Sequence, residues 1–570
     1  MPTLSTALSR LSRFTPLIAM AAAAAVYVAV TWNSKAPVFY NDEMGTLGSA
    51  QLFANPTTTW LLTGASYMPG FAILVTPLWW ITSDPLIVYR LAITLGALIS
   101  VATMVPLASI ARRFGAASGA SWWLAAIVMV APARALNADY VWSEQLLFFL
   151  IVWCLELLFS IESRGPRAAL VLGLAAGATF ATHGRALPFM LLVVAGGIWL
   201  KRKSLVSALA LVAGAAISAG IGYALFSYAQ SHMYVASERV GSTLDDIANV
   251  TPANYLVTVS AQMWYQIAAW AGMTLVGAVV AWRAARRERW RGVNTVVVGI
   301  CSMMALAAPV LVAGSSGLAA RLDAHFYGRY LDPFVAALAV VGLARLIEPV
   351  RARWLGALTA AALGSAALFL AVVTPGIPAG LGMTPIHVAG VAYLLHPEYA
   401  VTGDAENWPL VAFIAVAATV AVAIAALRRY MAALTAGIFL AAITVWTDLR
   451  IFDHYEAPQR AEPAIIKAID PIVPSVDLYA EYTNRYTLSQ GNRFTFWTAP
   501  RAYIYMDVTK DTSEVQMFVS GIDSEFAMTA GALPFTPSLV GDYVVWIMPG
   551  PLQDALAERD LLGPVPVSAP

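Results

Sequence analysis

The sequence predicts a polytopic α-helical membrane protein with a small C-terminal α/β domain outside the membrane. The chain of 570 residues is 59% hydrophobic and only 12% charged, and its mean hydropathy is +0.69. Apolar runs of membrane-spanning length recur from residue 16 to residue 447, and after that point they shorten to the length of strands. The balance of 34 Lys and Arg against 33 Asp and Glu gives no sign of a nucleic-acid surface.

The transmembrane helices are predicted from stretches of about 20 apolar residues between polar breaks, the length that crosses a bilayer. This rule predicts thirteen spans, over residues 16–32, 87–111, 116–132, 143–161, 168–182, 186–200, 204–228, 257–282, 293–313, 331–347, 354–374, 407–427 and 430–447. The run 68–81 is short and is interrupted by Pro69, Gly70 and Pro77. We therefore interpret it as a re-entrant or interfacial helix at the outer face.

The basic residues predict the orientation of the chain. Loops that stay in the cytoplasm are enriched in Lys and Arg. Alternate loops carry most of these residues here, including 201–203 and the arginine-rich stretch 283–291. We predict a multi-pass plasma-membrane protein with a cytoplasmic amino terminus. Because the number of spans is odd, its carboxyl terminus is exported, and the adjacent acids Asp42 and Glu43 of the first loop lie at the outer face.

The predicted domain boundary divides a transmembrane domain, residues 1–447, from an extracytoplasmic α/β domain, residues 448–570. The second domain contains the strand-like runs SVDLYAEY, RAYIYMDV, VQMFVSG and DYVVWIMPG. A helical pattern precedes them at 461–473 and another follows at 552–562. A segment of this size is long enough to bury a core of its own.

Cysteine and histidine give little sign of a disulfide framework or a fixed metal site. Cys154 and Cys301 lie in separate apolar runs, so we interpret them as core residues. All six histidines map to the predicted outer side but are dispersed, with no His-x-x-x-His spacing. The spacing therefore does not support a zinc site. A pocket with ionisable chemistry would open outward.

Several features follow one another in a characteristic order. They are NDE at 41–43, the proline-containing run 68–81, VYRLAITLGALISVATMVPLASIARRFG at 88–115, the acid that opens the fourth span in NADYVWSEQLLFF, and GRYLDPF at 328–334. Together they resemble the GT-C superfamily of polyprenyl-phosphate-sugar glycosyltransferases, in particular the branch of protein O-mannosyltransferases and the lipid A aminoarabinose transferase. The resemblance covers residues 16–200 well and the rest loosely. Family members often carry His-Pro-Pro after the first loop, where this chain has YMPG.

The resemblance implies a GT-C fold and an inverting transfer of a sugar from a polyprenyl phosphate to an acceptor at the outer face. The acceptor would be a glycan, lipid or protein of the cell envelope. Such a transfer needs a carboxylate that takes the proton of the acceptor hydroxyl, and cationic or hydrogen-bonding groups that hold the departing lipid phosphate. The sequence does not name the sugar.

By this resemblance Asp42 is the candidate general base, and Glu43 is its positioning or tuning neighbour. Glu144, with Asp139 nearby, matches the acid that the family places at the outer end of the fourth span. The alternative for the first pair is a helix cap, with Asn41 or Asp42 satisfying the free amides of the helix that follows. The alternative for Glu144 is a solvated span end. We favour catalysis for Asp42 because the topology independently places it at the outer face.

Arg329 and Tyr330 are the groups that we expect to hold the donor phosphate, with Arg185 and His325 as further donors. An arginine can contact phosphate oxygens at two points and stays charged near lipid. The alternative is an interfacial belt of aromatic and cationic side chains, which any span end can carry.

Other assignments stay open at this stage. A divalent ion could be held by Asp42, Glu43 or Glu144 together with the donor phosphate. A transporter or flippase of a lipid-linked or polar envelope precursor is the rival function. Transporters usually show paired halves and ionisable residues at mid-membrane, whereas here no duplication is evident and Glu156 is the main acid within a span. A scaffold whose exported domain binds a partner is a third assignment.

Overall fold

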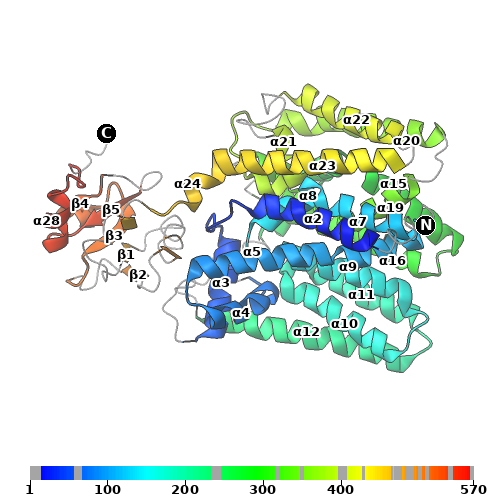
Figure 1. The fold of residues 1–570 in the computed structure, drawn as a ribbon, viewed down its shortest axis with the longest axis horizontal. Coiled ribbons are helices and arrows are strands. Elements are labelled where there is room, and N and C mark those ends of the chain that lie inside the picture. The colour runs from blue at the N-terminus through cyan, green and yellow to red at the C-terminus, as the bar shows by residue number, and fades with distance from the viewer. Residues whose placement is uncertain are drawn as a thin grey trace, which may run out of the picture. The chain divides into compact units, whose positions relative to one another are not determined.

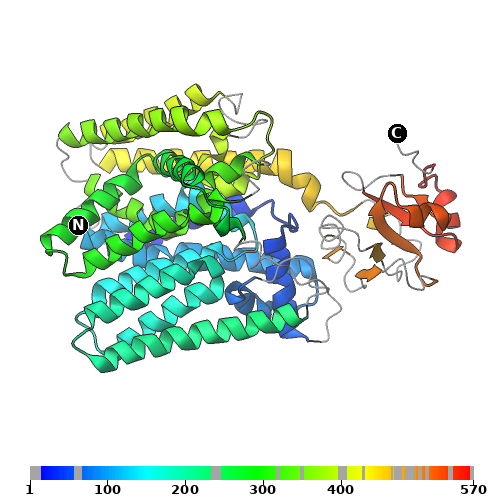
Figure 2. The ribbon, with the colours of Figure 1, turned by 180° about the vertical axis from the view of Figure 1, so that it is seen from behind.

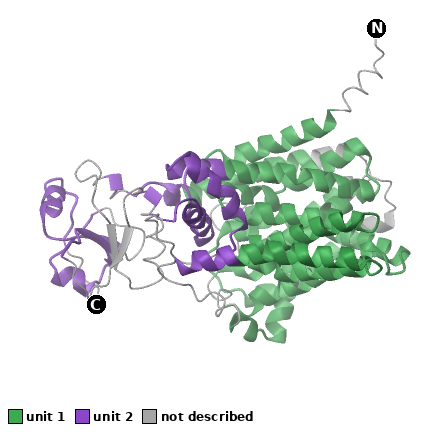
Figure 3. Ribbon diagram, turned by 90° about the horizontal axis from the view of Figure 1, so that it is seen from below, with its two compact units in different colours: residues 1–34, 93–223, 238–456 green, residues 35–92, 224–237, 457–570 purple. Residues whose placement is uncertain are grey.

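The structure is a computed structural model of the 570-residue chain. Figure 1 and Figure 2 show its ribbon from opposite sides, and helices predominate in both views. The contacts divide the chain into two compact units, coloured separately in Figure 3: unit 1 (1–34, 93–223 and 238–456) and unit 2 (35–92, 224–237 and 457–570). The structure describes residues 14–56, 67–232, 245–315, 321–346, 352–395, 407–425, 430–463, 466–467, 478–481, 493, 496–497, 503–506, 513–536 and 543–564.

Each predicted span coincides with at least one apolar helix. The helices are α2 (Thr15–Thr31), α5 (Pro85–Ala102), α6 (Met104–Arg113), α7 (Ser118–Val130), α9 (Glu144–Ile161), α10 (Pro166–Thr182), α11 (Leu187–Leu200), α12 (Leu205–Ser231), α14 (Pro252–Ala269), α15 (Met273–Arg287), α16 (Val293–Ala307), α19 (Asp332–Leu346), α20 (Ala352–Leu368), α22 (Trp408–Ala425) and α23 (Tyr430–Ile451). In the described part of the chain, five helices are long and apolar enough to cross a membrane, or up to seven if each bent pair is one span. The protein is therefore membrane-embedded, and the total of thirteen spans stays a prediction.

One predicted span is wrong as a single helix. The stretch 257–282 consists of parts of α14 and α15, which are bent by 101° relative to each other. At the break the backbone takes positive φ at Ala271 (44°) and Gly272 (74°), a conformation that an α-helix does not contain. Apolarity alone predicted a continuous run, because it does not register the backbone reversal.

Close packing of α15 against α19 depends on glycine. A Cβ atom at Gly277 would overlap the carbonyl oxygen of Leu338, and one at Gly342 would overlap that of Met273. Small residues at such positions let helix backbones approach closely in a membrane, where hydrophobic burial adds little to association. This contact fixes α19, the helix that follows the short helix η4 (Gly328–Tyr330).

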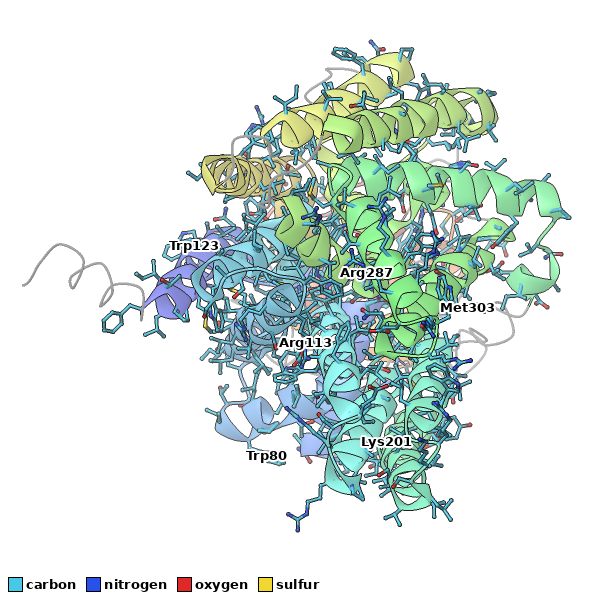
Figure 4. All side chains as sticks on the ribbon, turned by 90° about the vertical axis from the view of Figure 1, so that its right-hand side faces the viewer. Trp80, Arg113, Trp123, Lys201, Arg287 and Met303 are labelled. Carbon is cyan, nitrogen blue, oxygen red and sulfur yellow. The ribbon has the colours of Figure 1, made fainter. Side chains whose placement is uncertain are left out.

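The basic helix ends of unit 1 gather on one side of it. Figure 4 views the protein from one end, and Arg113, Lys201 and Arg287 all lie at the near end. The Lys201 ammonium also donates to the carbonyl oxygens of Glu162 (3.0 Å) and Arg164 (2.6 Å), which joins two basic turns. This arrangement is what the predicted cytoplasmic loops require, and the side of the membrane on which the termini lie stays a prediction.

Unit 2 contains the first loop with two short helices, and the C-terminal sheet with further short helices. The predicted re-entrant run forms α4 (Gly70–Ile81), which follows α3 (Asn41–Ala54). It has 12 residues, contains Pro77 and exposes 69% of Trp80. A helix of this length extends about 18 Å, less than the hydrocarbon core of a bilayer.

The C-terminal residues form a five-stranded sheet with the order β2-β1-β3-β5-β4. β1 pairs parallel with β2 and β3, whereas β5 pairs antiparallel with β3 and β4. Phe518 and Trp546 lie opposite each other on β3 and β5 and form the core of this sheet with Val515, Ala527 and Val544. The elements are β1 (Leu478–Glu481), β2 (Tyr503–Met506), β3 (Met517–Gly521), α27 (Glu525–Thr529), β4 (Leu533–Pro534), β5 (Tyr543–Ile547) and α28 (Pro551–Ala557).

The predicted α/β character of the C-terminal region agrees with this sheet, and the helix expected over 552–562 is α28. The helix expected over 461–473 falls mostly outside the described residues. The division at residue 447 stays a prediction, because the two compact units divide the chain differently and unit 2 also takes in residues 35–92.

Candidate active site

In unit 1, two arginines from distant parts of the chain meet on one carboxylate. Glu144 is the first residue of α9, Arg185 lies in the short helix η2 (Gly184–Ala186), and Arg329 lies in η4 (Gly328–Tyr330). The Oε1 atom of Glu144 accepts from Arg329 Nε at 2.6 Å and from Arg185 Nη2 at 3.0 Å. The sequence predicted each of the three as a site residue, and the structure brings them together.

This cluster is buried. The side chains of Glu144, Arg185 and Arg329 are 1%, 4% and 5% exposed. A solvated span end is therefore wrong for Glu144. Two desolvated guanidinium groups share one carboxylate oxygen, so the three side chains together carry an excess positive charge where water screens it little.

Aromatic rings enclose the two arginines. The Arg185 guanidinium lies 5.0 Å from the centre of the Tyr330 ring, and that of Arg329 lies 4.0 Å from the Trp142 ring. Tyr330 was a predicted site residue, whereas Trp142 was not. Trp142 precedes Glu144 by two residues in NADYVWSE, and only the fold reveals that its ring faces Arg329.

Arg134 is a third cation near Glu144, and the sequence did not single it out. It is 1% exposed and lies in α8 (Pro132–Ala135), after a 67° bend from α7. Its Nη2 atom is 3.5 Å from the backbone oxygen of Glu144 and 3.4 Å from Gln145 Oε1. Its guanidinium lies 4.0 Å from the Phe148 ring. Arg134 therefore adds positive charge beside the start of α9.

The remaining predicted residues of unit 1 lie in short helices. His325 is buried in α18 (Leu322–Phe326), and Asp139 is buried in η1 (Leu136–Asp139). Among the described residues, no group of three or more His, Cys, Asp and Glu side chains has the arrangement of a metal site.

In unit 2, Asp42 and Glu43 begin α3, and their side chains differ in environment. Asp42 is half-buried, whereas Glu43 is fully buried. The cap residue of α3 is Tyr40, and its side chain makes no capping hydrogen bond. Assigning Asn41 or Asp42 as the cap residue is therefore wrong. Asp42 lies in the first turn, where a carboxylate still complements the helix dipole.

Glu43 holds the segment that leads into α3. Its Oε2 atom accepts from the backbone N–H of Val38 at 2.9 Å, and its Oε1 atom accepts from the Tyr89 hydroxyl at 3.0 Å. Arg460 donates to the same hydroxyl at 2.8 Å. Phe39 takes a φ of 67°, which costs a non-glycine residue about 1–2 kcal/mol. A buried network therefore fixes a strained backbone next to Asp42.

Asp323, which lies close to Arg329 in the sequence, pairs with the distant His387, and neither was predicted as a site residue. Asp323 is fully buried, and its Oδ2 atom is 2.8 Å from His387 Nδ1, which must donate because a carboxylate only accepts. Burial raises the pKa of Asp323, but the hydrogen bond and charge of His387 and the charge of Arg321 outweigh it and hold that pKa below its usual value.

Burial also lowers the pKa of His387, and the charges of Arg329 and Arg321 lower it further. The hydrogen bond and charge of Asp323 act in the opposite direction and do not restore the usual value of 6.5. His387 is therefore neutral near pH 7, with its proton on Nδ1.

Acidification is expected to destabilise the folded protein through His387. Below pH 6.5, its unperturbed pKa, the unfolded chain takes up the proton before the folded chain does, so stability falls until the folded pKa is passed. Asp323 adds a further loss of stability only below pH 3.8, its unperturbed pKa. Its pKa is lower in the folded chain, so its ionised form stabilises the fold above that pH. The melting temperature should fall between pH 7.5 and pH 5 by less in His387→Asn than in the wild type. An equal fall in both proteins would contradict this.

The acid within a predicted span, Glu156, is part of a structural ion pair. Its two oxygens accept from Arg113 at 2.9 Å and 3.0 Å, and the arginine side chain is 35% exposed. Glu156 lies near the end of α9 that is opposite to Glu144. It therefore has a local partner at a helix end and gives no support to a mid-membrane transport path.

Solved structures share the fold of this chain. Structural comparison confirms the predicted GT-C fold, with matches that cover nearly the whole chain. No protein-family model matches the sequence, and no curated protein does.

The chain is similar to two solved structures of ArnT from Cupriavidus metallidurans. The first, bound to undecaprenyl phosphate, has a TM-score of 0.58 at 16% identity, and the match covers 94% of this chain and 98% of that one. The second, in the apo state, has a TM-score of 0.55 at 15% identity and covers 95% and 98%. An oligosaccharyltransferase from Archaeoglobus fulgidus also matches, with a TM-score of 0.40 at 12% identity over 90% and 70% of the chains.

Proposed function

We propose that the protein is an inverting glycosyltransferase that moves a sugar from a polyprenyl-phosphate donor to a glycan, lipid or protein acceptor of the cell envelope. The reaction would occur at the outer face of the plasma membrane. The observation that carries this proposal is the buried pair of arginines on Glu144, in a chain whose fold matches an ArnT structure bound to undecaprenyl phosphate.

The pair has the chemistry of a phosphate site. Among the described residues, the Nε and Nη1 atoms of Arg185 are buried without a hydrogen-bond partner. A buried donor without a partner costs free energy, and an anion with several oxygens would remove that cost. Arg185 and Arg329 would each offer the phosphate a planar fork of donors, which lysine does not have. Glu144 would hold the two forks apart and in place.

In the proposed reaction Asp42 takes the proton of the acceptor hydroxyl as its oxygen attacks the anomeric carbon. The bond between that carbon and the donor phosphate oxygen breaks, and the lipid phosphate leaves with the electron pair. Attack from the opposite face inverts the anomeric centre. The charge that grows on the leaving phosphate is stabilised by the arginines.

Other side chains have supporting roles in this proposal. Glu43 would keep the carboxylate of Asp42 in position through its bonds to Val38 and Tyr89. Tyr330 would present a hydroxyl and a ring beside Arg185. His325 and Asp139 stay proposed substrate-binding residues on their sequence position alone.

The direct test is a transfer assay. Purified protein in nanodiscs is incubated with a panel of radiolabelled polyprenyl-phosphate sugars and an envelope extract as the acceptor. We expect one donor to lose its sugar with release of the free lipid phosphate, and no loss with Asp42→Asn. A transporter or a scaffold would leave every donor intact.

Replacement of Arg329 by lysine tests the phosphate role. Lysine keeps the charge but offers no planar fork, so binding of undecaprenyl phosphate should weaken about tenfold or more, the amount expected for a lost charged hydrogen bond. The affinity is measured in nanodiscs by titration. Arg113→Lys, at the ion pair of Glu156, is the matched control and should leave the affinity unchanged. Unchanged affinity in Arg329→Lys would favour the interfacial belt.

A further inference from the structure

Buried carboxylates hold both ends of the segment that carries Arg329. At its start, Asp323 accepts from the backbone N–H of Thr384 at 2.8 Å as well as from His387. At its end, Asp332 accepts from the Tyr265 hydroxyl at 2.7 Å, Gln266 Nε2 at 2.8 Å and Trp270 Nε1 at 3.4 Å. Neither end can move without leaving a buried carboxylate short of partners, which is costly.

Between these ends the backbone is strained. Tyr327 has φ 27° and ψ 56°, a left-handed conformation that costs a non-glycine residue about 1–2 kcal/mol. Gly328 follows it, and a Cβ atom there would overlap the ring of Tyr265. Strain of this kind persists only where the surroundings over-determine the conformation, and it is often found at functional sites.

Two aromatic rings hold Tyr327 in this conformation. The His387 ring stacks on it with a centroid distance of 4.7 Å and an interplanar angle of 28°. The Tyr330 ring meets it edge to face at 4.4 Å and 62°. The hydrogen bond from His387 Nδ1 to Asp323 fixes the orientation of the imidazole. The histidine therefore supports the residue two positions before Arg329.

We propose that the Asp323–His387 pair positions Arg329 for the phosphate of the lipid donor and acts through the ring of Tyr327. The proposal rests on the proposed function, because it gives Arg329 a phosphate to bind. His387 is then a positioning residue rather than a catalytic one. The competing explanation is that the pair contributes to stability only.

His387→Asn separates these explanations. The side-chain amide of asparagine can still donate to Asp323 from nearly the place of Nδ1, so the buried carboxylate keeps its partner. The ring against Tyr327 is lost. We expect the melting temperature to stay close to that of the wild type, while undecaprenyl phosphate binds roughly fivefold to tenfold more weakly, a loss within the range of couplings between contacting residues. His454→Asn, at an exposed histidine of unit 1, is the matched control and should bind normally.

A double-mutant cycle with Arg329→Lys shows whether His387 acts through Arg329. If it does, His387→Asn should cost little further affinity once Arg329 is lysine. An equal loss in both backgrounds, or normal affinity of His387→Asn, would overturn the positioning role. If Arg329→Lys alone binds normally, the phosphate role in the proposed function fails instead. Should His387→Asn not fold, Tyr327→Leu removes the same ring contact, leaves the bond from His387 to Asp323 in place and enters the same cycle with the same decisive outcomes.

Discussion

Asp42→Asn is expected to lower the rate of sugar transfer by roughly 10²-fold or more, the usual contribution of a general base. Asparagine has the size of aspartate but does not accept the proton of the acceptor hydroxyl. Binding of undecaprenyl phosphate should be unchanged, because the proposed phosphate groups are arginines. Stability should fall by about 1 kcal/mol or less, the value of a carboxylate in a first helical turn. Rate, affinity and melting temperature are measured on the same preparation.

Glu43→Gln is the matched control, and we expect it to lose more stability and less activity than Asp42→Asn. Glu43 accepts from two donors, the Val38 N–H and the Tyr89 hydroxyl. A glutamine offers them one oxygen and one NH₂ group, so one donor loses its acceptor and stability falls by about 1–3 kcal/mol. The rate per folded molecule should fall less than in Asp42→Asn. A fully active Asp42→Asn enzyme would end the assignment of Asp42 as the base.

Most of the membrane fold could be predicted from the sequence because a bilayer imposes a simple rule. Every backbone polar group within it must be satisfied inside the chain, so apolar runs become helices. That rule located α9 and α12 within a few residues of their ends. It failed at 257–282, because the reversal at Ala271 and Gly272 depends on local backbone geometry that average apolarity does not contain.

The site could be predicted only as separate residues. Glu144 lies 41 positions from Arg185 and 185 positions from Arg329. Side-chain chemistry suggested each of them, but contact over such distances is set by how helices pack. Burial was also hidden from the sequence, since charged residues at span ends are usually hydrated.

The Asp323–His387 pair could not be predicted either, because its contact also depends on how distant segments pack. Its members are 64 positions apart, and a single histidine or aspartate in a polar loop carries no pattern. The one available signal was the density of polar and aromatic residues in RLDAHFYGRYLDP, the stretch that also contains the predicted residues His325, Arg329 and Tyr330.

Glu144→Gln should destabilise the protein more than any other single change considered for unit 1. The substitution removes the carboxylate that Arg185 and Arg329 share and leaves two buried like charges side by side. Loss of one partner of a buried ion pair typically costs about 3–5 kcal/mol. The apparent melting temperature in nanodiscs, followed at a fixed heating rate because unfolding of such proteins is often irreversible, should fall accordingly.

Glu156→Gln provides the matched control on the same helix. Its partner Arg113 is 35% exposed, so water can solvate the arginine that is left behind, and the loss should be about 1 kcal/mol or less. Equal losses in the two variants would contradict the burial argument.

Undecaprenyl phosphate gives a second readout, because its phosphate can replace the missing charge between Arg185 and Arg329. The lipid should therefore raise the melting temperature of Glu144→Gln more than that of the wild type, since at equal concentration a ligand that binds the folded state more tightly stabilises it more. If it stabilised both proteins equally, these arginines would not be the groups that bind its phosphate.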